Sequence, residues 1–500
     1  MRVRVGSPRL FPLMEELSEL LSIRRAKVDK LRELGVDPFG GLFPNTKTSK
    51  AILNFYEENL EVRYAGRVVS HRDMGKSHFL HLQDEAGKLQ IYVQTKTLTE
   101  KEQEVFKLID LGDFIGVDGT LFTTKTGEKS IKVTTLSFLS KALKPLPGKW
   151  HGLNDTEQRY RQRYLDMICN PEVKELLQMR SLITREIRKF MENKGFMEVE
   201  TPMMQAIPGG AAAQPFLTHH KALGIPLYLR IAPELYLKRL LVGGFEKVFE
   251  LNRNFRNEGI SRKHNPEFTM LEAYWAYADF EKMADLVEEL ITSLAMQFKG
   301  GEVLRHEQKN EQGEVVSEKV IDLTRPWKRK RYHDCIKEAA GADFFELTSE
   351  GRRERAKSLG VELSPQMEDF EVSNQVFEKL VEAKTINPLF VTHLPKELVP
   401  LARQNLENPG LVDVYELIIN GQEISPGYSE LNDPIVQRER LENQAGEETQ
   451  KLDEDFLTAL EHGMPPAGGL GMGIDRLIMM LTGAESIRDV ILFPLMKPRD

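Results

Sequence analysis

Cysteine and long apolar runs are what this sequence has least of. Its 500 residues include only two cysteines, Cys169 and Cys335, which stand far apart without the spacing of a zinc site. Neither a disulfide framework nor a structural zinc is indicated, and a reducing cytoplasm is the expected location. No segment approaches the roughly 20 apolar residues of a membrane span, and the N-terminus lacks the apolar core of a secretory signal. We therefore expect a cytoplasmic protein that does not enter a membrane.

The sequence also lacks the two commonest glycine-rich nucleotide motifs. Neither G-x-x-x-x-G-K-[ST] nor G-x-G-x-x-G before a helix occurs, so any nucleotide must be held in another way. What is present is a hydrophobic content of 41%, enough for a large core, on a length that suggests two to four domains. The net charge is −8, but residues 1–150 carry +5 and residues 151–500 carry −13. A nucleic-acid partner would prefer the N-terminal third.

The first 145 residues divide into a helical segment and a set of short strands. Leucines and valines at helical spacing predict a helix over 13–34, which either packs on a neighbouring domain or grips a partner. From 61 to 145, five short alternating segments separated by turns predict a small β-barrel. We accordingly place a helical segment at 1–60 and the barrel at 61–145, with a Pro-, Gly- and Lys-rich linker at 141–155.

Two of the barrel segments have an aromatic and amide face. In HFLHLQD (78–84) and KLQIYVQ (88–94), the period of two sends Phe79, His81, Gln90 and Tyr92 to the face opposite the leucines, isoleucine and valine. Unpaired bases offer a π-surface and an edge of donors and acceptors, so such a face suits single-stranded nucleic acid. The alternative is an aromatic side chain packed under a loop.

Residues 146–500 are expected to form one large α+β domain with an insertion at about 300–400. Its stretches 300–330 and 440–452 are polar and charged, which fits surface segments. The basic run RPWKRKRYH (325–333) is either a phosphate contact or, as we prefer, a solvated surface face.

A predicted hairpin joins VFELNRNFRNE (248–258) to FTMLEAYWAY (268–277) through the loop GISRKHNPE. If the two strands pair in antiparallel fashion, Arg256, Glu258, Phe268, Glu272 and Tyr274 line one platform. The guanidinium of Arg256 can donate two hydrogen bonds to a phosphate or carboxylate, and the ring of Phe268 can stack on a purine. His264 of the connecting loop can reach a polyphosphate. The alternative is a surface sheet laced by ion pairs.

A second hairpin is predicted at YELIINGQEISPGYSELND (415–433), because Asn420-Gly421 is a strong type I′ turn signal. Turn geometry pairs Ile418 with Glu423 and Glu416 with Ser425, and places the two glutamates on one face as diagonal neighbours. Two converging carboxylates repel each other unless they share a proton or a cation, and hard oxygen ligands are how Mg²⁺ is commonly held. The alternative is two solvated glutamates on an edge strand.

Alternating glycines precede a predicted helix in AGGLGMGIDRLIMML (467–481). Gly469, Gly471 and Gly473 strip one face of the strand of side chains, so a flat ligand could lie there with Arg476 aimed at its phosphates. Close packing of two elements is the rival explanation.

Together these segments resemble class II aminoacyl-tRNA synthetases, and within that class lysyl-tRNA synthetases. GFMEVETPMM (195–204) resembles motif 1, FRNEGISRKHNPEF (255–268) motif 2 and GLGMGIDR (469–476) motif 3, and the similarity runs from about residue 24 to the C-terminus. The HIGH and KMSKS signatures of class I synthetases are absent. The resemblance implies an α+β fold, in which an N-terminal OB-fold barrel for the anticodon precedes an antiparallel sheet flanked by helices. It also implies a homodimer with motif 1 in its interface.

The resemblance further implies a lysine–tRNA ligase that joins L-lysine to tRNA(Lys) through a lysyl-adenylate, using ATP and Mg²⁺. Arg256 and Arg476 would be catalytic. The lysine site would comprise Gly210, Glu234, Arg256, Glu272, Tyr274, Tyr428 and Glu430. ATP would meet Arg256, Glu258, His264, Asn265, Phe268, Glu416, Glu423 and Arg476, with Glu416 and Glu423 holding Mg²⁺. Arg72, Phe79 and Gln90 would contact anticodon bases.

One position departs from the family pattern. Pro426 stands where family members usually carry an Asn that helps to hold the substrate carboxylate, and Pro has no side-chain donor. We expect weaker lysine binding or a compensating donor.

Two other functions are weighed against tRNA charging. Synthetase-like ligases that give lysine to elongation factor P share the adenylation chemistry but lack the barrel. A nucleic-acid-binding module with an inactive synthetase domain is disfavoured because Arg256, Glu416, Glu423 and Arg476 are retained.

Overall fold

The computed structural model describes residues 10–147, 153–309, 314–445 and 452–498. By its internal contacts the chain divides into two compact units, Met1–Asn154 and Asp155–Asp500. This division falls at the end of the predicted linker 141–155, of which 148–152 lie outside the described residues, as do 446–451 of the polar stretch 440–452.

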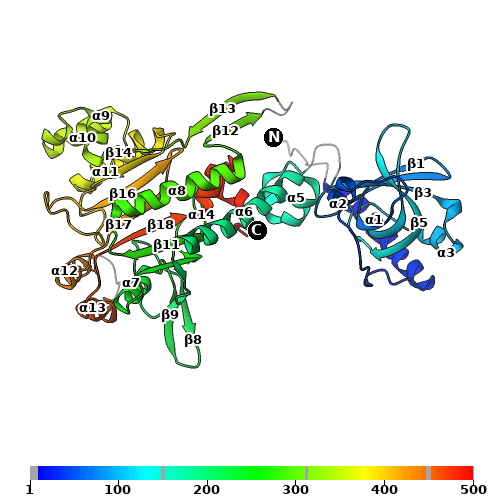
Figure 1. The fold of residues 1–500 in the computed structure, drawn as a ribbon, viewed down its shortest axis with the longest axis horizontal. Coiled ribbons are helices and arrows are strands. Elements are labelled where there is room, and N and C mark those ends of the chain that lie inside the picture. Colours follow the sequence, from blue (N-terminus) through cyan, green and yellow to red (C-terminus); the bar gives the residue numbers. More distant parts are fainter. Residues whose placement is uncertain (1–9, 148–152, 310–313, 446–451, 499–500) are drawn as a thin grey trace, which may run out of the picture. The chain divides into compact units, whose positions relative to one another are not determined.

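The first unit is a closed five-stranded barrel with added helices (Figure 1). Its elements are α1 (Leu10–Glu33), α2 (Ser49–Asn54), β1 (Glu61–Asp73), β2 (Ser77–Gln83), β3 (Lys88–Gln94), α3 (Glu100–Lys107), β4 (Phe114–Thr123) and β5 (Lys129–Ser140). The strand order is β1-β2-β3-β5-β4. The period-two prediction holds, since Leu80, Leu82 and Ile91 are fully buried inside the barrel. Leu31 of α1 and Ile52 of α2 belong to the same core, so the helical segment packs on the barrel.

The second unit is built on an eight-stranded sheet in the order β14-β15-β16-β17-β18-β11-β10-β6. Its central pairs are antiparallel, as expected, while the edge pairs β14–β15 and β10–β6 are parallel. Its strands are β6 (Met197–Glu198), β10 (Lys247–Phe255), β11 (Glu267–Ala276), β14 (Lys328–Arg331), β15 (Leu389–Thr392), β16 (Val414–Ile419), β17 (Gln422–Ser429) and β18 (Ala467–Gly473).

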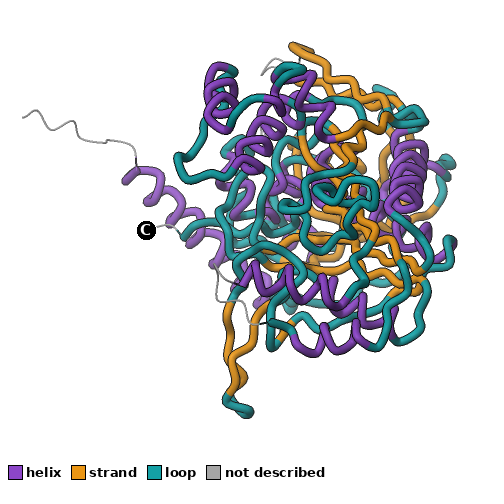
Figure 2. The backbone as a smooth tube through the Cα atoms, turned by 90° about the vertical axis from the view of Figure 1, so that its left-hand side faces the viewer, coloured by secondary structure: helices purple, strands orange, loops and turns teal. Residues whose placement is uncertain are grey.

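Two smaller sheets accompany it. They are formed by β7 (Met204–Gln205), β9 (Ile225–Leu229) and β8 (Leu217–His220), and by β12 (Val303–Lys309) and β13 (Val315–Asp322). The β8–β9 hairpin projects from its unit in both views (Figures 1 and 2).

Helices surround the strands of this unit (Figure 2). They are α4 (Thr156–Arg161), α5 (Arg163–Cys169), α6 (Pro171–Asn193), α7 (Glu234–Val242), α8 (Phe280–Lys299), α9 (Tyr332–Ala340), α10 (Ser349–Ser358), α11 (Asp369–Leu380), α12 (Pro434–Ala445), α13 (Glu454–Glu461), α14 (Ile474–Thr482) and α15 (Ile487–Val490). None of the described helices combines the length and the apolar character needed to cross a bilayer.

The two faces of the large sheet differ because strand side chains alternate. Phe249, Leu271 and Leu417 point to one face, where they form a single core with residues of α6, α8 and α14. Glu250 and Glu272, one residue along their strands from the core residues, point to the opposite face. The predicted insertion contributes β14 and β15 to the sheet edge. Its basic run lies on the surface as preferred: Arg329 is ion-paired with Glu281 and Asp285.

Candidate active site

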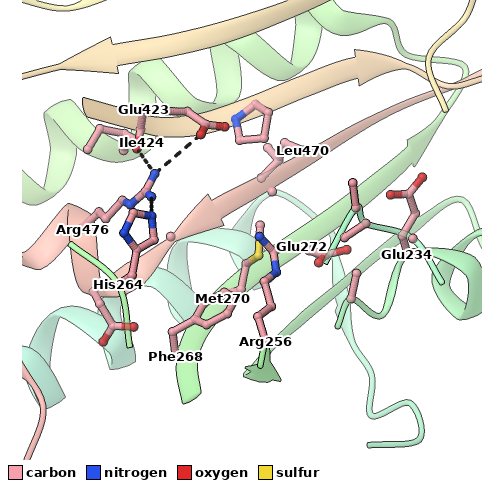
Figure 3. Close-up of a pocket in the computed structure, with 18 of the residues that line it drawn as sticks. Glu234, Arg256, His264, Phe268, Met270, Glu272, Glu423, Ile424, Leu470 and Arg476 are labelled. Atoms are coloured by element: carbon pink, nitrogen blue, oxygen red, sulfur yellow. Dashed lines mark hydrogen bonds and ion pairs between the residues drawn. The ribbon is translucent and has the colours of Figure 1, made fainter. Parts of the chain in front are cut away.

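A cavity of about 350 Å³ opens on the polar face of the large sheet (Figure 3). Its walls come from the segment before α7, the β10–β11 hairpin, β17 and the β18–α14 junction. Residues from four separated stretches of sequence therefore meet in one place. The lining includes Gly210, Glu234, Arg256, Glu258, His264, Asn265, Phe268, Glu272, Tyr274, Glu423, Tyr428, Glu430 and Arg476. Glu416 is the residue expected at this site that is not part of the lining.

The β10–β11 hairpin pairs as predicted, with Glu250 opposite Glu272 and Asn254 opposite Phe268. Arg256 follows β10 directly, and its backbone N–H donates to Pro266 O at 2.9 Å. Its guanidinium carbon lies 5.2 Å from the centre of the Phe268 ring. The Arg256 Nε atom is buried and has no hydrogen-bond partner among the described residues. Since a buried charged donor is costly without a partner, Arg256 is prepared for an anionic ligand.

One end of the cavity is acidic. Glu234, Glu272 and Glu430 are almost fully buried there, beside Tyr274 and Tyr428. Burial, reinforced by Glu234, raises the pKa of Glu272 to about 8, although Arg256 and Arg230 act in the opposite direction. Burial also raises the pKa of Glu430, while Lys238 lowers it. Glu272 and Glu430 are thus carboxyl groups whose ionised form a bound cation would favour.

The alternating glycines make room for this acidic end. A Cβ atom on Gly469 would lie 1.9 Å from Glu430 Oε1, and one on Gly471 would lie 2.5 Å from Met270 Cε. Any side chain at Gly469 would push Glu430 out of place. The close-packing explanation holds for Gly469, while Gly471 and Gly473 line the cavity, where the flat ligand stays a prediction.

The other end of the cavity is cationic. Arg476 Nη1 donates to Glu423 O at 2.9 Å and approaches Glu423 Oε2 at 3.6 Å, while Nη2 donates to His264 Nε2 at 3.2 Å. Because Nε2 accepts, the Nδ1–H of His264 donates to Ser261 Oγ at 2.8 Å. Burial and Arg476 lower the pKa of His264. Figure 3 shows this cluster at the opposite end of the pocket from Glu234 and Glu272, with Arg256 between them.

The pairing predicted for Glu416 is wrong. Glu416 lies opposite Pro426, not Ser425, because a bulge at 423–425 adds one residue to β17. The turn itself is as predicted, with Asn420 and Gly421 both at positive φ, and Ile418 does pair with Glu423. The bulge places Glu423 on the cavity side of β17 together with Pro426 and Tyr428.

The Glu416 carboxyl lies in acidic surroundings. Burial raises its pKa well above the usual value, and Glu423, Glu382 and Glu378 add to the effect. Such repulsion is what a bound cation relieves, and carboxylate oxygens are the donors that Mg²⁺ prefers, so the residues fit a divalent ion. Among the described residues no three acidic, His or Cys side chains converge closely enough to hold a metal by themselves. Phosphate oxygens would have to complete the shell.

Sequence reasoning missed several buried polar residues that support the cavity. Arg230 Nη1 pairs with Glu250 Oε1 at 2.7 Å, and Arg180 Nη1 pairs with Asp475 Oδ1 at 2.5 Å, while Asp475 Oδ2 accepts from Thr269 N at 2.8 Å. Lys238, wholly buried on α7, contacts Glu234 and Glu430. Asp475 could have been suspected because it directly precedes Arg476. The spacing of Glu234 and Lys238, four residues apart on one helix, is also a local signal, whereas Arg230–Glu250, Arg180–Asp475 and Lys238–Glu430 join segments too far apart in sequence for a pattern to indicate.

The aromatic face of the barrel exists as predicted. Arg72 lies opposite Phe79 on the next strand, and the Phe79 and Tyr92 ring centres are 4.9 Å apart. Gln90 differs from expectation because it is only 8% exposed. Its Nε2 donates to Glu128 Oε2 at 2.6 Å, and its Oε1 accepts from Ser130 Oγ at 2.7 Å. Its amide is already satisfied within the barrel.

Comparison with known proteins agrees with this geometry. Residues 155–497 match the family described as tRNA synthetases class II (D, K and N), and residues 62–139 match an OB-fold nucleic acid binding domain. The chain is 54% identical to the lysine–tRNA ligase of Pelotomaculum thermopropionicum, over 97% of this chain and 96% of that protein. It is 48% identical to the lysine–tRNA ligase of Bacillus subtilis, over 97% and 98%.

The chain belongs to the lysine–tRNA ligase family of class II tRNA synthetases. The resemblance inferred from the motifs is thereby confirmed, together with the α+β fold of an OB barrel followed by a synthetase domain. Membership of a family of ligases also disfavours a purely structural or nucleic-acid-binding protein.

Proposed function

We propose that this protein activates L-lysine with ATP and transfers it to the 3′ end of tRNA(Lys). The supporting observation is the polarity of the cavity: three buried carboxyl groups lie at one end, Arg476 and His264 lie at the other, and Arg256 lies between them. An amino acid with a cationic side chain fits the first end and a polyphosphate fits the second. Aspartate would bring a carboxylate next to buried like charge, so an aspartate enzyme is disfavoured.

Lysine would lie with its carboxylate at Arg256, whose buried Nε lacks a partner among the described residues. Its α-ammonium would lie near Gly210 and Glu234, where φ of +85° at Gly210 brings the backbone close. Its ε-ammonium would be held by two carboxylates and two ring faces, which come from Glu272, Glu430, Tyr274 and Tyr428.

ATP would occupy the cationic end. The adenine would stack on Phe268, while Glu258, His264 and Asn265 of the motif 2 loop would position the nucleotide. Arg476 would exchange its contacts with Glu423 and His264 for the γ-phosphate. Asn265 Oδ1 is buried without a hydrogen-bond partner among the described residues, so it has an acceptor to offer.

Glu416 and Glu423 would hold Mg²⁺, which would supply neutralising charge to the phosphate oxygens. When Arg476 turns to the γ-phosphate, Glu423 loses its 3.6 Å ion pair and becomes free to serve as a ligand. The like-charge surroundings of Glu416 favour the same role.

The chemistry needs no protein nucleophile. The lysine carboxylate attacks the α-phosphorus in line, the bond to the bridging oxygen breaks, and pyrophosphate leaves with its electron pair. A terminal tRNA hydroxyl then attacks the carbonyl carbon of the adenylate, and AMP leaves. Arg256 lies where it can touch both the carboxylate and the α-phosphate, so catalysis rests on positioning and charge stabilisation.

The barrel would hold the anticodon. Phe79 would stack on a base, Arg72 would contact a phosphate or base edge, and Gln90 would read a base edge after exchanging a partner. This domain favours tRNA as acceptor over the protein acceptor of the elongation factor P ligases, which lack it.

We further propose a cytoplasmic homodimer that uses the motif 1 region. Large apolar side chains are exposed on the elements around it: Leu182 of α6, Met197 of β6, Met204 of β7, Leu217 of β8 and Ile225 of β9. Exposed apolar residues of this kind mark interaction surfaces. Sedimentation of wild type and Met197→Glu would test it, since a stable dimer should become largely monomeric.

Lysine-dependent exchange of pyrophosphate into ATP is the direct test of the activity, followed by charging of tRNA(Lys). Exchange that requires lysine and is not supported by aspartate or asparagine is expected. Exchange without any tRNA charging, together with lysine transfer to a protein, would overturn the proposed acceptor. No exchange with any of the three amino acids would overturn the proposal itself.

A further inference from the structure

The side chain of Lys238 is wholly buried in the wall behind the acidic end of the cavity. It stands on α7, one turn after Glu234, in a helix whose other buried residues are mostly apolar. Its Nζ lies 2.7 Å from Glu234 Oε1 and 2.5 Å from Glu430 Oε2. A fully buried ammonium is rare and costs free energy unless it is paired, so this one requires an explanation.

We propose that Lys238 is a positioning residue that sets the charge and the shape of the lysine pocket. This proposal rests on the function proposed above. The ammonium of Lys238 bridges two carboxylates on different elements, α7 and the end of β17, and holds both against the cavity.

The charges explain why a fixed cation belongs there. With Glu234, Glu272 and Glu430 ionised, the wall carries three negative charges, and Lys238 reduces the net charge to −2. Free lysine brings two ammonium groups to this end, and its carboxylate is directed to Arg256. The net charge of −2 therefore balances the two ammonium groups of lysine. Without Lys238, one of the three carboxylates would be left without a cationic partner.

The geometry leaves each carboxylate with capacity for a ligand. Lys238 donates a hydrogen bond to Glu234 Oε1, which leaves the other oxygen of that carboxylate available. Glu430 Oε2 lies 2.5 Å from Lys238 Nζ, so the other oxygen of this carboxylate, Oε1, is the one left for a ligand. Lys238 thus fixes the orientation of the two carboxylates and leaves each of them an oxygen that can accept a hydrogen bond from a ligand.

The ionisable groups around Lys238 and its two partners come from three elements. Glu234 on its own helix and Glu430 after β17 act on Lys238 itself, while Tyr428 of β17 and Glu272 and Tyr274 of β11 interact with these carboxyl groups. Burial disfavours the charge of Lys238, but Glu234 and Glu430 outweigh it and raise its pKa above the ordinary value. Loss of its ammonium would raise the pKa of Glu430 further, so that a proton would replace the ammonium in the ligand-free pocket.

Lys238→Met tests the proposal because it keeps the shape of the side chain and removes the charge. In pyrophosphate exchange at pH 7, the KM for lysine should rise at least tenfold, while the KM for ATP stays within twofold. The KM for lysine of this variant should also fall more steeply than that of wild type between pH 6 and 8, because the carboxyl group that takes up a proton in place of Lys238 loses it as the pH rises.

Two further variants separate charge from packing. Leu241→Ala removes a buried apolar side chain from the same helix, so it should lower the melting temperature without changing the KM for lysine or the pH dependence of that KM. Glu234→Gln combined with Lys238→Met restores the net charge of −2, so its KM for lysine should vary with pH between 6 and 8 as that of wild type does.

A KM for lysine in Lys238→Met that equals that of wild type in both value and pH dependence would overturn the proposal. So would a double variant whose KM for lysine still falls with pH as steeply as that of Lys238→Met. If Lys238→Met does not fold, the double variant decides, since it leaves one buried carboxylate without a cationic partner where Lys238→Met leaves two. Wild type that binds lysine in the calorimeter without catalysing exchange would refute the proposed function alone, and wild type that does not bind lysine would refute both.

Discussion

The polar groups of the barrel face and those of the catalytic cavity differ in whether they have partners within the protein. On the barrel, Gln90, Glu128 and Ser130 satisfy one another through hydrogen bonds of 2.6 and 2.7 Å, and Phe79 rests against Tyr92. In the cavity, Arg256 Nε has no partner among the described residues and the pKa of Glu272 is raised to about 8. The polar groups named on the barrel face have partners within the protein, whereas the cavity holds charged groups whose partners a ligand would supply.

The difference follows from what each surface would bind. A nucleic-acid surface stays hydrated between encounters, so its groups have to be stable in water, and stacking supplies affinity with little reorganisation. A cavity for a small charged molecule gains selectivity from buried groups that only the right charges can satisfy. Variants should therefore have large effects in the cavity and modest, separable effects on the barrel.

Arg256→Ala should have the largest effect. Arg256 is the cation expected to contact both reacting groups, and loss of such a charge-stabilising donor typically costs about 10²–10³-fold in rate. Pyrophosphate exchange should fall by that factor, while tRNA binding measured by filter retention should stay within twofold. Arg253→Ala is the matched control, since Arg253 lies on β10, three residues before Arg256, and contacts Glu267 outside the cavity. Exchange that survives in Arg256→Ala would exclude this residue from the reaction.

Glu272→Gln should come next. It replaces a carboxylate by a neutral amide, so the KM for lysine in the exchange assay should rise about 10-fold to 100-fold, with the KM for ATP unchanged. In wild type, the free carboxyl is protonated below about pH 8, so lysine binding should strengthen as pH rises from 6 to 8. The variant should flatten that part of the profile. An unchanged profile would mean that another group titrates.

The same carboxyl makes a prediction about stability. Its pKa in the folded, ligand-free protein is about 8, against an ordinary value near 4.5, so the folded state binds the proton more tightly. Its contribution to stability is complete below about pH 4.5 and is lost as pH rises towards 8. Ligand-free wild type should lose more melting temperature between pH 6 and 8 than Glu272→Gln, and saturating lysine should reduce the loss. Equal losses in the two proteins would contradict a raised pKa.

Phe79→Ala tests the barrel half of the comparison. Loss of one base-stacking ring costs about 1–3 kcal/mol, so kcat/KM for tRNA charging should fall about tenfold or somewhat more. Pyrophosphate exchange should not change, because it does not use the anticodon. Phe55→Ala serves as control, since Phe55 is an exposed ring of the same unit outside the predicted face. A parallel fall in exchange would indicate damage to folding instead.

How far the sequence could predict these two regions also differs. The barrel face came from a period of two within single strands, and Leu80, Phe79 and His81 lie on the sides that the alternation predicted. The strands of the motif 2 hairpin and the Asn420-Gly421 turn were predictable for the same reason, since each depends on neighbours in sequence.

The remainder depended on contacts that local patterns do not encode. A single added residue at 423–425 shifted Glu416 from Ser425 to Pro426, and Pro426 indicates an irregular strand there without specifying the register that results. The alternation of side chains predicted that Gln90 is exposed. Instead its amide is hydrogen-bonded to Glu128 and Ser130, some 40 residues later in the sequence. Lys238 reads as an ordinary basic residue of a surface helix until Glu430, nearly 200 residues away, is placed against it.

Pro426→Asn should have the smallest effect, and it probes why the cavity tolerates a residue without a donor. Pro is normally confined to strand edges or bulges because it has no backbone N–H, and here the bulge at 423–425 immediately precedes Pro426. Ser425 Oγ donates a hydrogen bond to Gly471 O at 2.7 Å, which connects β17 to β18 without an N–H from Pro426. Asn at this position would add a donor facing the substrate carboxylate, and one net hydrogen bond of about 1 kcal/mol corresponds to about a fivefold lower KM for lysine. Pro426→Ala is the control because it restores the N–H without adding the amide. If Ala lowers the KM as much as Asn does, the gain comes from the strand, and the cavity has no place for a donor at this position.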